Sequence, residues 1–157
     1  MADLPDFIGV LSNLTKLFLG HTNIRSINCI ESLRNLTDLY AGNTHITAFP
    51  EAVVRLTNLI HLDLEGNALT SLPTSIENLS HLSTLYVGSN QLTFVPECIG
   101  KFTNLTELML ADNALTSLPE SIGQLTKLTD LWLYETPLTE AEIDRLSSLF
   151  PKGVCDW

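Results

Sequence analysis

Residues 59–69 read LIHLDLEGNAL, residues 82–92 read LSTLYVGSNQL, and residues 105–115 read LTELMLADNAL. The three stretches share one frame, with apolar residues at positions one, four, six and eleven and asparagine at position nine. The same frame, with more substitutions, begins at Leu14, Leu36 and Leu128, so six copies start 22 and then 23 residues apart. A period this regular predicts an array of stacked structural units.

Each unit divides into two halves with different patterns. In the first half side chains alternate as in a β-strand, so that Leu17 and Leu19 point one way and Phe18 points the other. Such a short strand buries its apolar face only when copies stack. The second half of the middle units reads FPEAV, LPTSI, VPECI or LPESI. Its proline fixes φ and lacks an N–H donor, which predicts a turn into an irregular or short-helical segment.

The pattern L-x-x-L-x-L-x-x-N-x-L resembles that of the leucine-rich repeat family, and the resemblance runs from about Leu4 to Leu138. The 23-residue unit with L-P-x-x-I is similar to the class found in intracellular scaffold proteins and bacterial leucine-rich repeat proteins. This resemblance implies an α/β solenoid shaped as a right-handed horseshoe. A six-strand parallel sheet would form its concave side, and irregular or short-helical segments its convex side.

The asparagine position is not filled uniformly along the array. Asn67, Asn90 and Asn113 occupy it in the third, fourth and fifth units, whereas the outer units carry Thr22, Thr44 and Thr136. In the family this amide bonds to backbone groups of neighbouring turns. A hydroxyl has one donor where an amide has two, so we expect a tighter array in the middle than at the ends.

The C-terminal segment leaves the repeat pattern. Thr139 to Glu142 has the form of a capping box, and the apolar residues that follow recur at helical spacing until Pro151. The sequence therefore predicts an amphipathic helix over about 140–150 that closes the core. We interpret residues 1–157 as one domain, with an N-terminal half-unit (1–13), six repeats (14–138) and a C-terminal helical cap (139–157).

The N-terminal half-unit has two interpretations. Residues 4–11 match the second half of a unit without a preceding strand. They form either a minimal cap, which we favour, or the start of a fragment from a longer array. The second interpretation predicts an apolar, self-associating N-terminal end, although we expect a monomer.

The net charge, the apolar runs and the cysteines of the chain exclude several classes of function. The chain has 157 residues, 30 of them leucine, and 18 acidic against 8 basic residues give a net charge of −10. This charge argues against nucleic acid or an anionic membrane as partner. No apolar run has the roughly 18 residues of a membrane span. The start of the chain lacks the pattern of a secretion signal, and three scattered cysteines suit reduced thiols. We therefore expect a cytoplasmic protein, or one secreted into a host cytoplasm.

Catalytic motifs are absent from the sequence. It contains no P-loop, dinucleotide-binding, H-E-x-x-H or G-x-S-x-G pattern, so we predict no enzymatic activity and no cofactor. His61, Asp63 and Glu65 alternate along one strand, and Asp38 is expected beside His61 on the neighbouring strand. These are divalent-cation ligand types, but we favour a solvated polar patch and predict no metal site.

The outward positions of the six strands predict the recognition surface. The position between the second and third leucines carries Phe18, Tyr40, Asp63, Tyr86, Met109 and Trp132. Exposed aromatic residues and methionine are typical of binding surfaces. The alternative is that neighbouring rings pack on one another and stiffen the sheet. Because the face is expected to be open, we favour binding.

Acidic residues surround this stripe. The flanking outward positions carry Asp38, Glu65, Glu107, Asp112, Asp130 and Glu135, together with Tyr134 and a single lysine, Lys16. The sequence therefore predicts a basic partner protein that docks on apolar anchors rimmed by carboxylates. The candidate protein-binding residues are Phe18, Tyr40, Asp63, Tyr86, Glu107, Met109, Asp130, Trp132 and Tyr134.

The predicted function is that of a protein-interaction module, either a scaffold or a bacterial effector. The alternative is the substrate-recognition part of a larger enzyme, such as a ligase or kinase, whose catalytic domain lies elsewhere.

Overall fold

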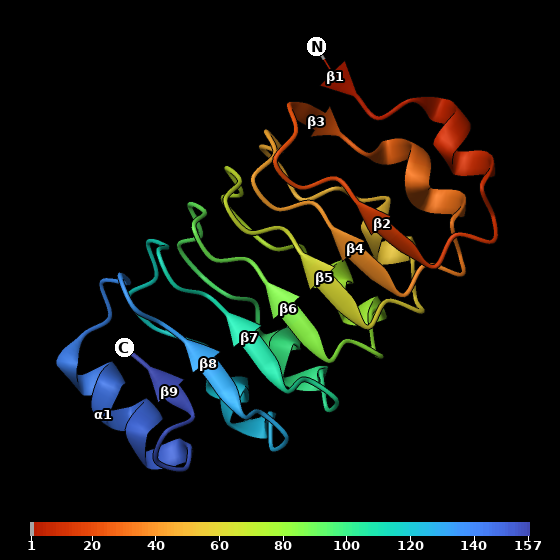
Figure 1. The fold of residues 1–157 in the computed structure, drawn as a ribbon. Coiled ribbons are helices and arrows are strands. Elements are labelled where there is room, and N and C mark those ends of the chain that lie inside the picture. Colours follow the sequence, from red (N-terminus) through yellow and green to blue (C-terminus); the bar gives the residue numbers. More distant parts are fainter. Residues whose placement is uncertain (1) are drawn as a thin grey trace.

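The computed structural model describes residues 2–157 as a solenoid with an open parallel sheet along one face (Figure 1). Each unit contributes one three-residue strand, which begins two residues after the first leucine of that unit. These strands are β2 (Lys16–Phe18), β4 (Asp38–Tyr40), β5 (His61–Asp63), β6 (Thr84–Tyr86), β7 (Glu107–Met109) and β8 (Asp130–Trp132). Their register is uniform, since the central leucine of each strand opposes that of the next.

The sheet has seven strands rather than the six that the repeat predicted. The additional strand is β9 (Cys155–Asp156), which pairs with β8 at the C-terminal edge. The backbone N–H groups of Leu131 and Leu133 donate to the carbonyls of Val154 and Asp156. The tail after the capping helix thus returns to the sheet and covers an edge that the repeats would leave unpaired.

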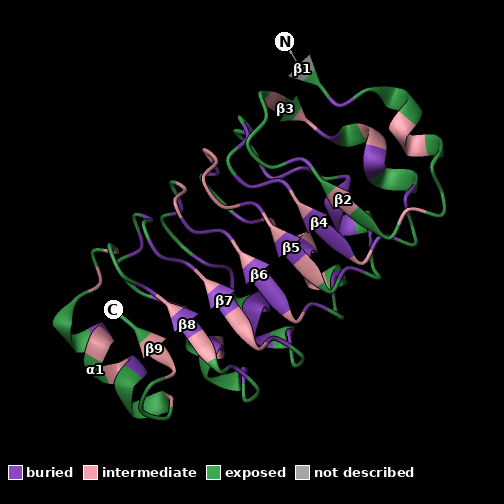
Figure 2. Ribbon diagram, in the orientation of Figure 1, coloured by how far each residue is buried: buried purple, intermediate pink, exposed green. Residues whose placement is uncertain are grey.

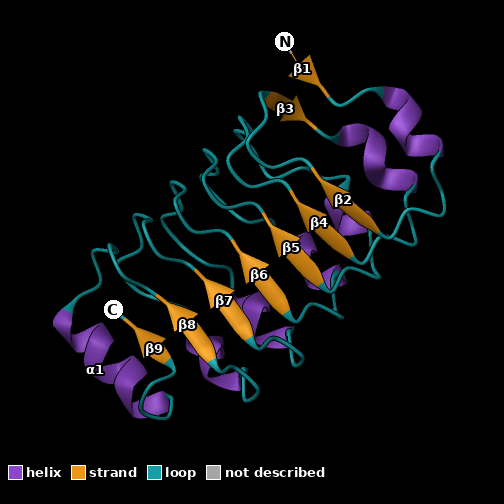
Figure 3. Cartoon of the chain, viewed as in Figure 1, coloured by secondary structure: helices purple, strands orange, loops and turns teal. Residues whose placement is uncertain are grey.

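The face behind the sheet consists of short 3₁₀ helices (Figure 3). They are η1 (Asp6–Val10), η2 (Asn28–Ser32), η3 (Val53–Arg55), η4 (Thr74–Asn78), η5 (Glu97–Lys101) and η6 (Glu120–Gln124). Pro73, Pro96 and Pro119 immediately precede η4, η5 and η6, with extended backbone angles. The predicted turn into a short-helical half is therefore confirmed.

The core is a set of apolar columns between these two faces (Figure 2). The first three leucines of the third unit, Leu59, Leu62 and Leu64, are fully buried, and the same holds for the fifth unit. Leu14 and Leu17 of the first unit are only half-buried. Burial is therefore most complete in the middle of the solenoid, where each unit has a neighbour on both sides.

The N-terminal half-unit packs against the first complete unit. Its strand β1 (Ala2–Asp3) pairs with β3 (Ile24–Ser26) in a separate two-stranded sheet. Helix η1 lies next to η2, and the Ser32 hydroxyl donates to the Gly9 carbonyl at 2.6 Å. Phe7 and Val10 on η1 stay exposed, so this end carries uncovered apolar surface.

The asparagine side chains form a hydrogen-bonded ladder through Asn67, Asn90 and Asn113. Each amide Nδ2 lies within hydrogen-bond distance of three backbone carbonyls, and each Oδ1 accepts from a backbone N–H of the preceding unit. Thr22 and Thr136 bond only to a carbonyl of their own unit. Thr44, by contrast, also lies 2.7 Å from Asn67 Oδ1 of the next unit. The predicted difference is therefore present in the hydrogen bonds of the first and sixth units, but not of the second.

The C-terminal cap contains the predicted helix, α1 (Glu140–Leu149), with Thr139 as N-cap. The Thr139 hydroxyl accepts from the Glu142 N–H at 3.2 Å. The Glu142 carboxylate does not close the predicted capping box, because it turns inward to accept from the Leu118 N–H at 2.7 Å and to pair with Arg145. Helix α1 is the longest helix in residues 2–157. No helix in these residues has the length and apolar composition needed to cross a bilayer.

The second residue after the third core position of every unit has a left-handed backbone. These residues are His21, Asn43, Gly66, Ser89, Asp112 and Glu135, with φ between 49° and 63°. In five of the six the N–H donates to a carbonyl of the next unit, so the conformation is part of the stacking. Only Gly66 adopts it without a side-chain penalty.

Gly66→Ala is expected to lower the free energy of unfolding by about 1 kcal/mol, because a Cβ in this backbone region is strained. An added Cβ would also lie 2.5 Å from Asn43 Oδ1, which has to move. Chemical denaturation measures the change. The matched control is Gly123→Ala in η6, where the added Cβ makes ordinary contacts of 3.5 Å with Leu149. Equal destabilisation by both substitutions would contradict the prediction.

Candidate functional site

The uncovered face of the sheet, called the concave face below, presents three rows of side chains. The central row is Phe18, Tyr40, Asp63, Tyr86, Met109 and Trp132, which oppose one another in strand register. The row two residues earlier is Lys16, Asp38, His61, Thr84, Glu107 and Asp130. The third row follows the strands and includes Glu65 and Tyr134. All nine residues predicted for the site thus lie on one face.

The aromatic residues of the central row form two groups. The Phe18 and Tyr40 rings stack with centroids 4.7 Å apart and planes 6° apart. The Tyr86 and Trp132 rings meet edge to face at 5.9 Å across the strand that carries Met109. The structure therefore contains the packing of neighbouring rings that we considered as the alternative to a binding role. This packing leaves Phe18 69% exposed, whereas Tyr40, Tyr86, Met109 and Trp132 are half-buried.

Tyr134 extends the second aromatic group beyond the strands. It is 38% exposed, and its hydroxyl lies 4.0 Å from the Met109 sulfur. Tyr86, Met109, Trp132 and Tyr134 together form an apolar patch over β6, β7 and β8, which we call the anchor patch. The three aromatic side chains of this patch have few rotatable bonds and lose little conformational entropy when they contact a partner.

One carboxylate of the concave face is neutralised internally. Asp38 is buried and pairs with Lys16 at 3.2 Å. Burial acts to raise the pKa of this carboxyl, but hydrogen bonds from Thr37 and Lys16 and the Lys16 charge outweigh it and lower the pKa. No ion pair among residues 2–157 involves the other carboxylates of the face. Their negative charge is therefore open to a partner.

The tyrosine hydroxyl of Tyr86 is held by a carboxylate. It donates to Glu107 Oε2, and burial, this hydrogen bond and the neighbouring negative charges raise the pKa of Tyr86. Tyr86 is consequently neutral at physiological pH and fixed in position. The Glu107–Tyr86 contact connects the acidic row to the anchor patch.

One acidic residue of this face was not predicted. Asp156 on β9 opposes Trp132 and extends the central row by one position. The concave face therefore carries eight carboxylates, at Asp38, Asp63, Glu65, Glu107, Asp112, Asp130, Glu135 and Asp156. The only sequence signal for Asp156 is its place after Gly153, which ends the turn that leads back to the sheet.

The polar group around His61 does not assemble as a cation site. Asp38 lies beside His61, as expected, but it is occupied by Lys16. Asp63 Oδ1 accepts from the Glu65 backbone N–H at 2.9 Å. The part of the chain that the structure describes contains no group of three potential metal ligands with suitable geometry.

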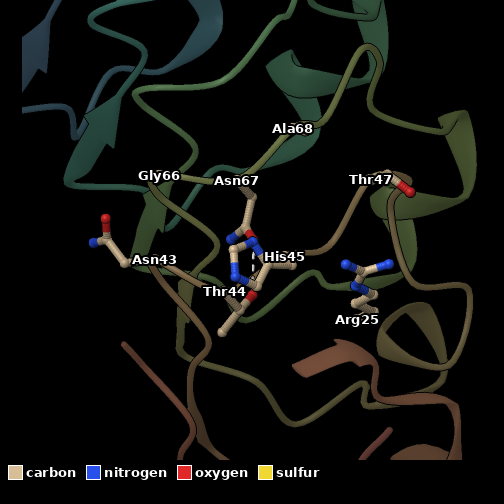
Figure 4. Close-up of a pocket in the computed structure, with 8 residues that line it drawn as sticks. All are labelled: Arg25, Asn43, Thr44, His45, Thr47, Gly66, Asn67 and Ala68. Atoms are coloured by element: carbon tan, nitrogen blue, oxygen red, sulfur yellow. Dashed lines mark hydrogen bonds between the residues drawn. The ribbon is translucent and has the colours of Figure 1, made fainter. Parts of the chain in front are cut away.

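A cavity of about 620 Å³ lies beside this face, at the edge where the strands end (Figure 4). Thr44, His45 and Asn67 are side by side at its centre, with Asn43 and Arg25 on either side. Thr44 bonds to Asn67 at 2.7 Å, and His45 bonds to Asn23 at 3.0 Å. These central polar groups already serve the stacking of units, so the concave face is the stronger candidate site.

The cysteines show no sign of reactivity. Cys29, Cys98 and Cys155 are free thiols, and burial is the largest cause that raises the pKa of each. A raised pKa keeps the thiol protonated at neutral pH and makes it a poor nucleophile.

Comparison with known proteins agrees with this architecture. Residues 50–150 match the family described as "Leucine-rich repeat region". A solved leucine-rich repeat protein of Leptospira interrogans aligns with a TM-score of 0.79 at 30% identity, over 99% of this chain and 46% of the other. An internalin (inlF) from Listeria monocytogenes aligns with a TM-score of 0.79 at 26% identity, over 99% of this chain and 51% of the other. A search of curated proteins found no match.

The chain belongs to the leucine-rich repeat family. It spans about half the length of the two solved structures that it matches. Proteins of this family are typically modules that bind other proteins, and the right-handed horseshoe predicted from the repeat is confirmed.

Proposed function

We propose that this protein is a non-enzymatic interaction module that binds a basic protein partner on its concave face. The observation that supports the proposal most is the anchor patch, where four large side chains stand partly exposed amid unpaired carboxylates. Central apolar anchors with a polar rim are the typical anatomy of a protein-binding surface.

The charge distribution supports a basic partner. Residues 56–157 carry 13 acidic and 4 basic side chains, whereas residues 1–55 carry 5 and 4. The negative potential is therefore strongest over the units that carry the anchor patch. Complementary charge speeds encounter and orients a partner more than it adds to final affinity. We accordingly expect the association rate to fall as salt concentration rises.

We further propose that the protein acts in a reducing compartment, either the cytoplasm of the producing cell or that of a host. The three free thiols suit such a compartment. The likeness to bacterial leucine-rich repeat proteins supports a bacterial scaffold or effector.

The double variant Tyr86→Ala, Trp132→Ala is expected to lose about 30-fold or more in affinity for the partner, because central aromatic residues carry most of the energy of such interfaces. Quantitative mass spectrometry of proteins captured from lysate would identify candidates, and titration of each purified candidate would measure its affinity. The matched control is Phe94→Ala, which removes an aromatic residue that is 53% exposed outside the strands.

A second variant separates binding from folding, because the Tyr86 and Trp132 rings also pack on each other. Asp112→Asn, Asp130→Asn and Glu135→Gln together remove three charges from the face while keeping side-chain shape. Asparagine tolerates the left-handed backbone at position 112. Association should slow in this variant. A partner that binds wild type and both concave variants equally, with circular dichroism showing them folded, would overturn the assignment.

A further inference from the structure

The central row of the concave face has a hollow at its middle. Among the six repeat strands, Asp63 stands where the other members of the row are aromatic or methionine. It opposes Tyr40 on one side and Tyr86 on the other. A cavity of about 150 Å³ results, lined by Tyr40, His61, Asp63, Thr84, Tyr86 and Glu107. One water occupies about 30 Å³ in the liquid, so the hollow has room for the head of a side chain.

The walls of the hollow are fixed by contacts outside it. Tyr40 stacks on Phe18, and its hydroxyl is 3.5 Å from Asp38 Oδ1. Tyr86 packs edge to face on Trp132 and donates its hydroxyl to Glu107. Both rings are therefore held apart before any partner arrives. A preorganised site of this kind requires little further ordering on binding.

The floor of the hollow is a carboxylate without a cation. Asp63 accepts one backbone hydrogen bond through Oδ1 and has no ion-pair partner among residues 2–157. Burial raises the pKa of Asp63, and only the Glu65 N–H and the more distant His21 act against this. Gly42 allows the arrangement, because a Cβ at that position would lie 3.0 Å from Asp63 Oδ1. The ionised group is thus partly desolvated and poorly compensated.

We infer that this hollow is a subsite for one arginine side chain of the partner, with the guanidinium between Tyr40 and Tyr86 and paired with Asp63. The inference rests on the proposed function and specifies the chemistry at its centre. A guanidinium is planar and weakly hydrated, pairs with carboxylates through two N–H groups, and is attracted to aromatic rings. Glu107 at the rim adds a second negative charge.

The test uses N-acetylarginine amide as probe, with the neutral isostere N-acetylcitrulline amide for comparison. In NMR titrations of the isotope-labelled chain, the arginine probe should shift the resonances of Tyr40, His61 and Tyr86, and the citrulline probe should bind about tenfold more weakly. Asp63→Asn should weaken the arginine probe by about tenfold. Glu51→Gln, which removes an exposed carboxylate between β4 and η3 and outside the hollow, should leave the affinity for the arginine probe unchanged.

Equal binding of the two probes, or shifts spread over the acidic face without a maximum at the hollow, would overturn the inference. So would unchanged binding in a folded Asp63→Asn variant. The proposed function is tested separately with a captured partner. A partner that is lost on Trp132→Ala but binds Asp63→Asn normally would refute the subsite and leave the module intact. The proposed function would be refuted instead if the arginine probe binds at the hollow but no substitution on the concave face changes the affinity for the partner.

Discussion

Replacing Asn90 with alanine is expected to lower the free energy of unfolding by about 3 kcal/mol. The Asn90 amide stands in the middle of the ladder, with Nδ2 at 3.0, 3.1 and 2.9 Å from the carbonyl oxygens of Leu64, Val87 and Gly88. Its Oδ1 accepts from the Leu69 N–H at 2.9 Å. Alanine would leave the Leu69 N–H without an acceptor in the interior, which costs about 1–3 kcal/mol when this group stays dry. It would also remove the two amide donors from the three carbonyls, at about 0.5–1.5 kcal/mol for each hydrogen bond lost. These carbonyls keep Asn67 Nδ2, Asn113 Nδ2 and the Gly66 N–H as donors. Urea denaturation followed by circular dichroism measures the loss.

Two comparisons test the reason for the loss. Thr22→Ala removes a single hydrogen bond at an exposed end position and should cost about 1 kcal/mol or less. Asn78→Ala removes an exposed asparagine from η4 and should change stability by less than about 0.5 kcal/mol. Equal losses for Asn90 and Thr22 would mean that the ladder does not connect units in the way the hydrogen bonds indicate.

The position of Asn90 gives the prediction a second readout. Units of a solenoid interact only with their neighbours, so a weakened contact in the middle separates two half-arrays. Hydrogen exchange should then speed up first at Leu69 and along the strands on either side of Asn90. Uniform acceleration over the whole chain would contradict this local effect.

Much of the fold follows from the sequence because the repeat determines register. The spacing from Leu59 to Leu82 to Leu105 brings His61, Thr84 and Glu107 side by side without further information. Alternation along each three-residue strand then assigns side chains to the core or to the concave face. For the same reason, all nine candidate site residues were placed on one face.

The remaining features depend on contacts that no period encodes. Strand β9 has two residues, and its position follows from the way α1 returns the chain to β8. The inward turn of Glu142 depends on the Leu118 N–H, which lies 24 residues earlier in the chain. The hollow at Asp63 depends on the hydrogen bonds that the Tyr40 and Tyr86 hydroxyls donate to neighbouring carboxylates. The sequence places these residues in rows but does not determine their rotamers.

Glu142→Ala is expected to lower the free energy of unfolding by about 3 kcal/mol, because it opens the C-terminal cap. The Glu142 carboxylate is buried, accepts from the Leu118 N–H, and pairs with Arg145 at 2.7 Å. Arg145 in turn donates to the Leu118 carbonyl at 3.0 Å. Removal of one partner from a fully buried pair typically costs about 3–5 kcal/mol, since the other charge is left uncompensated. The Arg145 side chain is 31% exposed and keeps that carbonyl contact, so we expect no more than the lower end of this range.

The same carboxylate makes the cap sensitive to acid. The hydrogen bond from Arg145 is the largest cause that lowers the pKa of Glu142 below its ordinary value of 4.5, and the Leu118 N–H lowers it further. A lowered pKa in the folded state means that the ionised group stabilises the fold above pH 4.5, and that this contribution is lost as pH falls through the folded-state pKa.

The difference in stability between wild type and Glu142→Gln should therefore be largest near neutral pH and shrink on acidification. Glu140→Gln, in the same first turn of α1 but exposed, is the matched control and should change stability by less than about 0.5 kcal/mol. A difference between wild type and Glu142→Gln that stays constant from pH 7 to pH 3 would show that Glu142 acts through packing alone.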